Sequence, residues 1–74
     1  MTIRASMLGL VIDVRVKSGD IITSGKSLII LEAIKMERKI HSIASGRVKS
    51  IFVEEKTTVE KNQPLLVIQA SEPS

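Results

Sequence analysis

The best candidate for chemistry in this sequence is one lysine, Lys35, which lies between two apolar residues in the segment Glu-Ala-Ile-Lys-Met-Glu at residues 32–37. Strand-like segments precede and follow it, so Ile34 and Lys35 are predicted to form the centre of a tight turn. A lysine amine is a nucleophile only when deprotonated, and the sequence shows no acid–base pair, nucleophile–base pair or phosphate-binding loop beside it. We therefore expect Lys35 to be acylated by another enzyme rather than to catalyse a reaction itself.

Ile34 and Met36 place apolar side chains on both sides of this lysine. Exposed apolar groups beside a lysine favour a docking surface, or a surface that covers a prosthetic group. The alternative is an ordinary solvated lysine whose two neighbours fold back onto the core. Because isolated exposed apolar residues are common, these residues alone leave both interpretations open.

The composition limits the other kinds of site that the chain can hold. Its 74 residues are enough for one domain, 1–74, with a small core. Cysteine is absent, which excludes disulfides, thiol nucleophiles and zinc knuckles. The one histidine, His41, cannot form a multi-histidine metal site and is predicted to be a structural or surface residue.

Charge and hydropathy argue against nucleic-acid and membrane partners. The net charge is only +3, and the basic residues at positions 38–49 are accompanied by a single aromatic residue in the chain, Phe52. A nucleic-acid-binding barrel stacks bases on several aromatic side chains. No apolar run approaches the roughly 18 residues that span a bilayer, so we expect a cytoplasmic protein. We also predict a monomer.

Short apolar segments rich in Ile and Val, separated by turn-forming residues, predict an all-β fold. Residues 11–16 alternate, with apolar side chains at the even positions, as in a half-buried strand. Residues 28–31 and 65–68 are continuous apolar runs, which predict fully covered strands. Residues 33–39 contain helix-forming types but form a short segment between two strands, so we predict a hairpin with its turn at 33–37.

An internal repeat organises these segments. When the sequence is shifted by 37 positions, residues 3–33 align with residues 40–70 without a gap. Six pairs are identical: Ile3/Ile40, Gly9/Gly46, Val11/Val48, Val16/Val53, Leu28/Leu65 and Ala33/Ala70. Neither half has enough apolar surface to fold alone, so we predict two antiparallel sheets packed face to face about a pseudo-two-fold axis. Lys35 falls in the join between the halves, and residues 71–74 are predicted to form a frayed tail.

Around this join the sequence resembles the biotin/lipoyl attachment family. Residues 33–36, Ala-Ile-Lys-Met, resemble the Ala-Met-Lys-Met attachment motif of biotinyl domains. Residues 5–9 and 42–46 are similar to the two Ala-Pro-x-x-Gly segments of that family. Residues 16–20 resemble its Val-x-x-Gly-Asp turn, and residues 25–28 its Gly-Gln-x-Leu segment. The size of the chain resembles that of a free-standing carrier protein of the family.

This resemblance implies a biotin carboxyl carrier with a flattened eight-stranded β-barrel of two four-stranded sheets, a barrel-sandwich hybrid. Lys35 then stands at the attachment position, where a biotin protein ligase joins biotin to the amine as an amide. The attached biotin carries a carboxyl group from a biotin carboxylase to a carboxyltransferase, so the chain is a carrier and not an enzyme. Ligase recognition is implied for the residues around the lysine: Glu32, Ala33, Ile34, Met36 and Glu37.

Two kinds of departure from the family pattern affect the turns. Ile34 replaces the methionine before the lysine. A β-branched residue disfavours the positive φ of a type I′ turn, so a different or slightly strained turn is expected. Lys56 stands where the first half has Gly19 and is expected to need a different turn geometry. Asn62 in place of Gly25 is a milder change, because Asn tolerates the left-handed region.

Two rival functions remain on the same fold. A lipoyl carrier would attach lipoate to Lys35, but lipoyl domains usually carry Asp before and Ala after the lysine. Ile34 and Met36 therefore favour biotin over lipoate. An unmodified interaction module would keep the barrel and attach nothing, and the substitution at Ile34 is the residue that supports it.

Overall fold

Eight strands joined by turns make up residues 1–70, the part of the chain that the computed structural model describes. In chain order the strands are β1 (Thr2–Arg4), β2 (Gly9–Val14), β3 (Ile21–Ile22), β4 (Ser27–Ala33), β5 (Met36–His41), β6 (Gly46–Ile51), β7 (Thr58–Val59) and β8 (Pro64–Ala70). Within these residues no helix has the length and apolar character needed to cross a membrane. The hairpin predicted at 33–37 joins β4 to β5, and the tail predicted at 71–74 lies outside the described residues.

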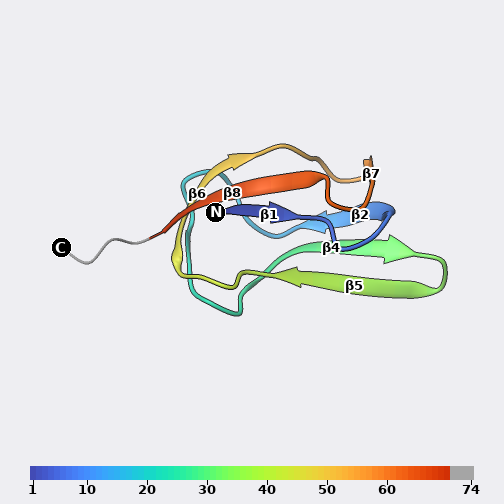
Figure 1. The fold of residues 1–74 in the computed structure, drawn as a ribbon, viewed down its shortest axis with the longest axis horizontal. Helices are drawn as coiled ribbons and strands as arrows, with labels where there is room; N and C mark the ends of the chain where they lie inside the picture. Colours follow the sequence, from blue (N-terminus) through green and yellow to red (C-terminus); the bar gives the residue numbers. More distant parts are fainter. Residues whose placement is uncertain (71–74) are drawn as a thin grey trace.

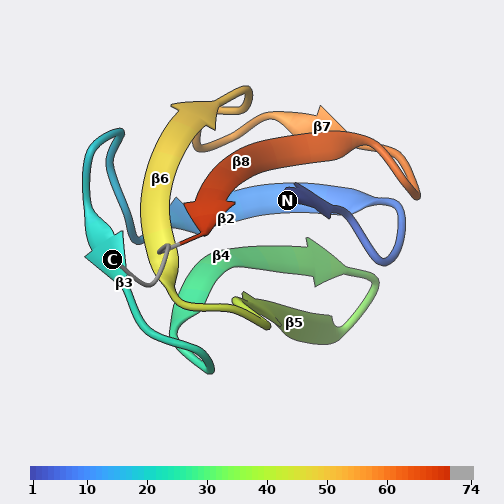
Figure 2. The same ribbon diagram turned by 60° about the vertical axis from the view of Figure 1, so that its left-hand side comes forward.

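The strands form two four-stranded antiparallel sheets that pack face to face (Figures 1 and 2). Their strand orders are β1-β8-β6-β3 and β5-β4-β2-β7. Exchanging each strand of the first half with its counterpart four strands later converts one order into the other. The strands β2, β3 and β4 also begin 37 positions before β6, β7 and β8. The predicted all-β sandwich with a pseudo-two-fold internal repeat is confirmed.

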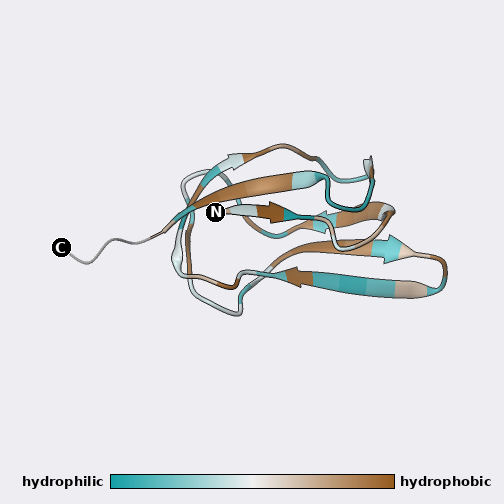
Figure 3. Cartoon of the chain, in the orientation of Figure 1, coloured by the Kyte–Doolittle hydropathy of each residue, from teal (hydrophilic) through white to brown (hydrophobic). Residues whose placement is uncertain are grey.

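Both halves contribute almost equally to the core between the two sheets. Pairs of buried residues 37 positions apart supply all but one of its members: Ile3/Ile40, Val11/Val48, Val16/Val53, Ile22/Val59, Leu28/Leu65, Ile29/Leu66 and Leu31/Ile68. The remaining member is Ala5, whose counterpart Ser42 is also buried. Figure 3 shows this apolar character along β8 and the first part of β4. Because each half buries its apolar side chains against the other, the hydrophobic effect holds the two halves together.

A β-bulge explains why burial does not follow the simple alternation expected for residues 11–16. The register of β2 against β4 shifts between Val11 and Asp13. An extra residue on one strand turns the side chains that follow toward the other face. Val11 and Val16 are therefore both buried, whereas Ile12 is half-buried. The predicted half-buried strand is present as β2, but its burial does not follow the even-numbered positions.

The two continuous apolar runs are covered at all but one position each. Ile30 in β4 and Val67 in β8 are half-buried, while the other residues of both runs are buried. These two side chains lie on the outer faces of the sheets, which no further layer covers in the described part of the chain. The prediction of fully covered strands is wrong at Ile30 and Val67.

Two turns of each half require a residue with positive φ. Gly19 and Gly25 have φ values of 94° and 92°, and their counterparts Lys56 and Asn62 have values of 71° and 69°. The amides of Gly19 and Lys56 donate hydrogen bonds to carbonyls of β6 and β2, at 2.8 and 2.6 Å. The expectation that Lys56 needs a different turn geometry is therefore wrong. The repeated hydrogen bond holds Lys56 in the left-handed region although that conformation costs about 1–2 kcal/mol for a residue with a Cβ.

Gly9 and Gly46 begin β2 and β6 at points where a neighbouring backbone passes very close. A Cβ added to Gly46 would lie 2.2 Å from the carbonyl oxygen of Gln69. A Cβ added to Gly9 would lie 3.0 Å from the carbonyl oxygen of Glu32. The approach of β6 to β8, and to a smaller degree that of β2 to β4, depends on glycine at these two positions.

Candidate functional site

The β4–β5 hairpin projects at one end of the molecule and carries Lys35 in the turn at its tip (Figure 1). Cross-strand pairs continue up to the turn, with Glu32 opposite Glu37 and Ala33 opposite Met36. A regular ladder therefore supports the turn from both sides. This support fixes the point at which the lysine side chain leaves the backbone.

The turn uses positive φ at one of its two central residues. Lys35 has a φ of 58°, whereas Ile34 is not among the residues with positive φ. A type I′ turn requires positive φ at both positions, so this turn is of another type. The β-branched Ile34 thus avoids the backbone strain that a type I′ turn would impose. The different turn type expected from this substitution is confirmed.

Both apolar residues beside the lysine face solvent. Ile34 is 91% exposed and Met36 is 52% exposed, and Lys35 between them is also exposed. Within the described part of the chain, no ion pair involves Lys35. Figure 3 shows the apolar tip next to the polar stretch of β5. The interpretation in which these neighbours fold back onto the core is wrong, because the hairpin extends beyond the side chains that could cover them.

A shallow groove lies beside the tip, between the hairpin and the start of β2. Lys35 and Ile34 line it together with Leu8, Leu10 and Thr58. Leu8 is 61% exposed and Leu10 is half-buried, so the groove presents apolar surface next to the lysine. Such a surface favours the interpretation in which the tip covers or docks an apolar group.

The sequence reasoning did not assign Leu8, Leu10 or Thr58 to the site. The internal repeat contains the signal that would have found the first two. The positions equivalent to Leu8 and Leu10 in the second half are occupied by Ser45 and Arg47. Because the equivalent positions accept polar residues in the other half, the fold does not require apolar side chains there. Their exposure therefore points to a functional surface.

The five residues predicted for ligase recognition all lie on the hairpin around Lys35. Glu32 and Glu37 are exposed and directly opposite each other, and like charges in that arrangement destabilise a sheet by roughly 0.2–1 kcal/mol. The pair therefore does not serve the stability of the hairpin. Their role in recognition by a ligase stays a prediction.

His41 and Phe52, which were also considered from the sequence, and Met7 lie outside the Lys35 turn. His41 is exposed at the end of β5, as predicted for a surface residue. Met7 is partly buried and packs against the core, and Phe52 is 57% exposed just after β6. Among residues 1–70 no three His, Cys, Asp or Glu side chains are grouped in a way that could hold a metal ion.

The sequence matches one known protein family over a range that includes the lysine hairpin. The sequence profile of the family described as biotin-requiring enzyme matches residues 1–68, which include the whole lysine hairpin. The chain belongs to this biotin/lipoyl family. The resemblance stated from the attachment motif and the repeat is confirmed.

The biotin/lipoyl domain is similar to parts of much longer proteins. It is 35% identical over 68 residues to the mouse mitochondrial methylcrotonoyl-CoA carboxylase subunit alpha, covering 92% of this chain and 10% of that protein. It is 37% identical over 67 residues to the biotin carboxyl carrier protein of Streptococcus mutans serotype c, covering 90% of this chain and 52% of that protein. The chain thus spans at most about half the length of these curated relatives.

The fold of the biotin/lipoyl domain also matches a solved carboxylase structure. It superposes on part of a single-chain, multi-domain long-chain acyl-CoA carboxylase with a TM-score of 0.91 at 27% identity, covering 100% of this chain and 7% of that one. The predicted biotin/lipoyl domain is confirmed, and the description of the family as biotin-requiring enzyme favours biotin over lipoate.

Proposed function

We propose that Lys35 is the residue to which biotin is attached, and that the chain carries the attached group between the active sites of a carboxylase system. The observation that carries this proposal is the position of Lys35. It is exposed, it lies at the tip of the β4–β5 hairpin, and it occupies the one hairpin that joins the two halves of the repeat. No other described lysine combines these properties with apolar residues on both sides.

The residues present fit a covalently attached biotin. Formation of the amide requires the Nζ atom of Lys35 to enter the active site of a biotin protein ligase that holds biotin as its adenylate. The deprotonated amine attacks the acyl carbon, a C–N bond forms, the C–O bond to AMP breaks, and the amine releases one proton to solvent. The exposed tip permits this approach, because neither Lys35 nor Ile34 is covered by the barrel.

The barrel contributes presentation rather than catalysis. When attached, biotin carries a carboxyl group, which a biotin carboxylase supplies and a carboxyltransferase removes. The paired strands up to Ala33 and Met36 keep the attachment point rigid while the lysine arm moves. Tethering in this way raises the effective concentration of the carried group at each active site. The similarity to a protein named as a biotin carboxyl carrier supports a carrier role in place of an enzymatic one.

The test is the intact mass of the chain after co-expression with a biotin protein ligase, followed by peptide mapping around Lys35. A single biotinyl adduct on Lys35 is the expected result. A lipoyl adduct, obtained with a lipoate ligase in place of the biotin adduct, would instead support the lipoyl carrier. The absence of an adduct with either ligase would support the unmodified interaction module. Monomeric state and cytosolic location stay predictions, which sedimentation and cell fractionation test.

Ile34 offers a graded test of ligase recognition. Replacing it with the methionine usual at this position, Ile34→Met, keeps an apolar side chain but removes the β-branch that stiffens χ1. The initial rate of biotin incorporation is expected to stay equal or to rise, and the melting temperature is expected to stay unchanged because Ile34 is 91% exposed. A marked slowing of incorporation would contradict this expectation and would mean that the ligase prefers isoleucine.

A further inference from the structure

The outer face of the sheet β1-β8-β6-β3 carries cations without opposing carboxylates. Arg4 in β1 and Arg47 and Lys49 in β6 are exposed, and the four strands of this sheet contain no Asp or Glu. The other sheet, which bears the lysine hairpin, includes Asp13 and two glutamates in its strands. The positive charge of the molecule is therefore unevenly divided between its two faces.

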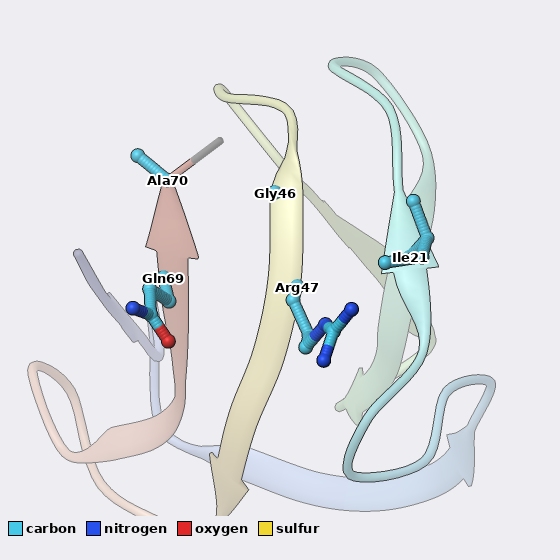
Figure 4. Close-up of a pocket in the computed structure, with 5 residues that line it drawn as sticks. All are labelled: Ile21, Gly46, Arg47, Gln69 and Ala70. Atoms are coloured by element: carbon cyan, nitrogen blue, oxygen red, sulfur yellow. The ribbon is translucent and has the colours of Figure 1, made fainter. Parts of the chain in front are cut away.

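A groove at one end of this face combines a cation with an apolar side chain. It lies where β3, β6 and β8 meet, and Ile21, Arg47, Gln69 and Ala70 line it around Gly46. Figure 4 shows the side chain of Arg47 extending from β6 toward β3, the strand that carries Ile21. Ile21, one of the two residues of β3, is 67% exposed. With a volume of about 290 Å³, the groove is at the lower limit for small-molecule sites.

The first half of the repeat shows that the fold itself does not require these cations. The positions equivalent to Arg47 and Lys49 are Leu10 and Ile12, and strand β2 forms with apolar residues there. The groove at Arg47 is itself the pseudo-two-fold counterpart of the groove beside Lys35. The second half thus presents a basic surface where the first half presents an apolar one.

The turn before β3 brings one cation and one carboxylate to the edge of this region. The hydroxyl of Ser18 donates a hydrogen bond to the carbonyl of Lys49 at 3.2 Å, which holds this turn against β6. Lys17 in the turn is exposed. The one carboxylate close by, that of Asp20, accepts a hydrogen bond from the backbone amide of Lys17 at 2.9 Å. In the described part of the chain, neither Arg47 nor Lys49 forms an ion pair.

We propose that this surface, defined by Ile21, Arg47 and Lys49, docks an extended acidic segment of a partner protein. Charge complementarity selects the acidic character, and the exposed Ile21 selects an apolar side chain within the segment. Carboxylates at alternate positions of an extended segment lie roughly 7 Å apart. Arg47 and Lys49 are both exposed along β6, which has a β-bulge between Val48 and Ser50.

A nucleic acid is the other polyanion that a basic face can bind, and the residues favour it less. Base stacking needs aromatic side chains, and this face has none among its strands. The docking surface also lies apart from Lys35, so its occupation leaves the lysine tip free. The proposal does not depend on which group Lys35 carries.

The probe for the test is a soluble nine-residue peptide in which glutamates alternate with threonines around one central leucine. Isotope-labelled protein is titrated with it at low salt, and backbone amide shifts are followed by NMR. Saturable shifts confined to residues 17–22, 46–50 and 67–70 are expected. The double variant Arg47→Glu/Lys49→Glu is expected to weaken binding about tenfold or more, because two charge contacts become repulsive.

The matched control is Arg38→Glu/Lys39→Glu, which makes the same change in net charge with two exposed residues on the other sheet. It is expected to change the affinity less than twofold. An equal loss of peptide affinity in both variants would show that net charge alone explains the effect, and would overturn the proposal. Shifts spread over both sheets, or the absence of saturable binding, would also overturn it. Tighter binding of an oligothymidine of equal charge to the same residues would assign the face to nucleic acid instead. Biotin incorporation at Lys35 is measured on both variants as a second readout. The proposed attachment at Lys35 and the proposed peptide binding can then fail independently of each other.

Discussion

Lys35→Arg is expected to abolish biotin incorporation completely while the barrel keeps its stability. Arginine preserves the positive charge and most of the length of the side chain, but its guanidinium is not deprotonated in proteins and does not form the amide. The residue is exposed at the hairpin tip, so the substitution removes no buried contact. The measurement is the intact mass after incubation with a biotin protein ligase, biotin and ATP, paired with a thermal melt.

The control for this variant is Lys39→Arg, four residues away on β5 and also exposed. It is expected to incorporate one biotin per chain, as the unaltered protein does. If Lys35→Arg still gained the mass of a biotinyl group, another lysine would be the attachment site and the assignment of Lys35 would fail. A loss of labelling in Lys39→Arg as well would show that the ligase, or the fold, had failed in the assay.

Gly46→Ala is expected to produce the largest loss of stability among the four possible glycine-to-alanine changes. The new Cβ would lie 2.2 Å from the carbonyl oxygen of Gln69 and 2.9 Å from a side-chain carbon of Ile68. The backbone of β6 or β8 must then shift, at a cost of roughly 3 kcal/mol. For a domain of this size that corresponds to a fall in melting temperature of roughly 12–24 °C.

Gly9→Ala is the matched comparison, because Gly9 holds the equivalent position in the first half. Its added Cβ would lie 3.0 Å from the nearest atom, the carbonyl oxygen of Glu32, so a small adjustment suffices and the cost is about 1 kcal/mol or less. Urea denaturation of both variants gives the two free energies of unfolding. Equal losses, or a larger loss for Gly9→Ala, would contradict the closer approach of β6 to β8.

The sequence was sufficient to predict the sheets because the repeat is nearly complete in the core. A shift of 37 positions pairs almost every buried residue with another buried residue, and this pattern requires two equivalent halves. The bulge near Ile12 was not predictable, because local alternation does not show where a strand gains an extra residue. The conformation of Lys56 was missed for a related reason. Propensity disfavours it, and a hydrogen bond to the other half decides it.

The lysine tip was predictable from residue types alone, but the groove beside it was not. Lys35 and its apolar neighbours are contiguous in the chain, so their motif is visible in the sequence. Leu8 and Thr58 reach the same place from separate turns and strands, and their proximity depends on the pairing of β2 with β4 and β7. The exposure of Ile34 and Met36 also could not be predicted, because it depends on how far the hairpin extends beyond the core.

That extension has a consequence for how the chain can change over evolutionary time. The residues around Lys35 contribute almost nothing to the core, whereas the paired core residues carry nearly all of the burial. Substitutions at the hairpin turn therefore change the free energy of unfolding little, even though a small domain is only marginally stable. Natural selection can act on the turn and on the core as two nearly independent traits. The turn residues of such a barrel can therefore change together with its modifying enzyme. They can also be exchanged for those of a relative that carries another prosthetic group, while the core and the stability of the fold stay the same.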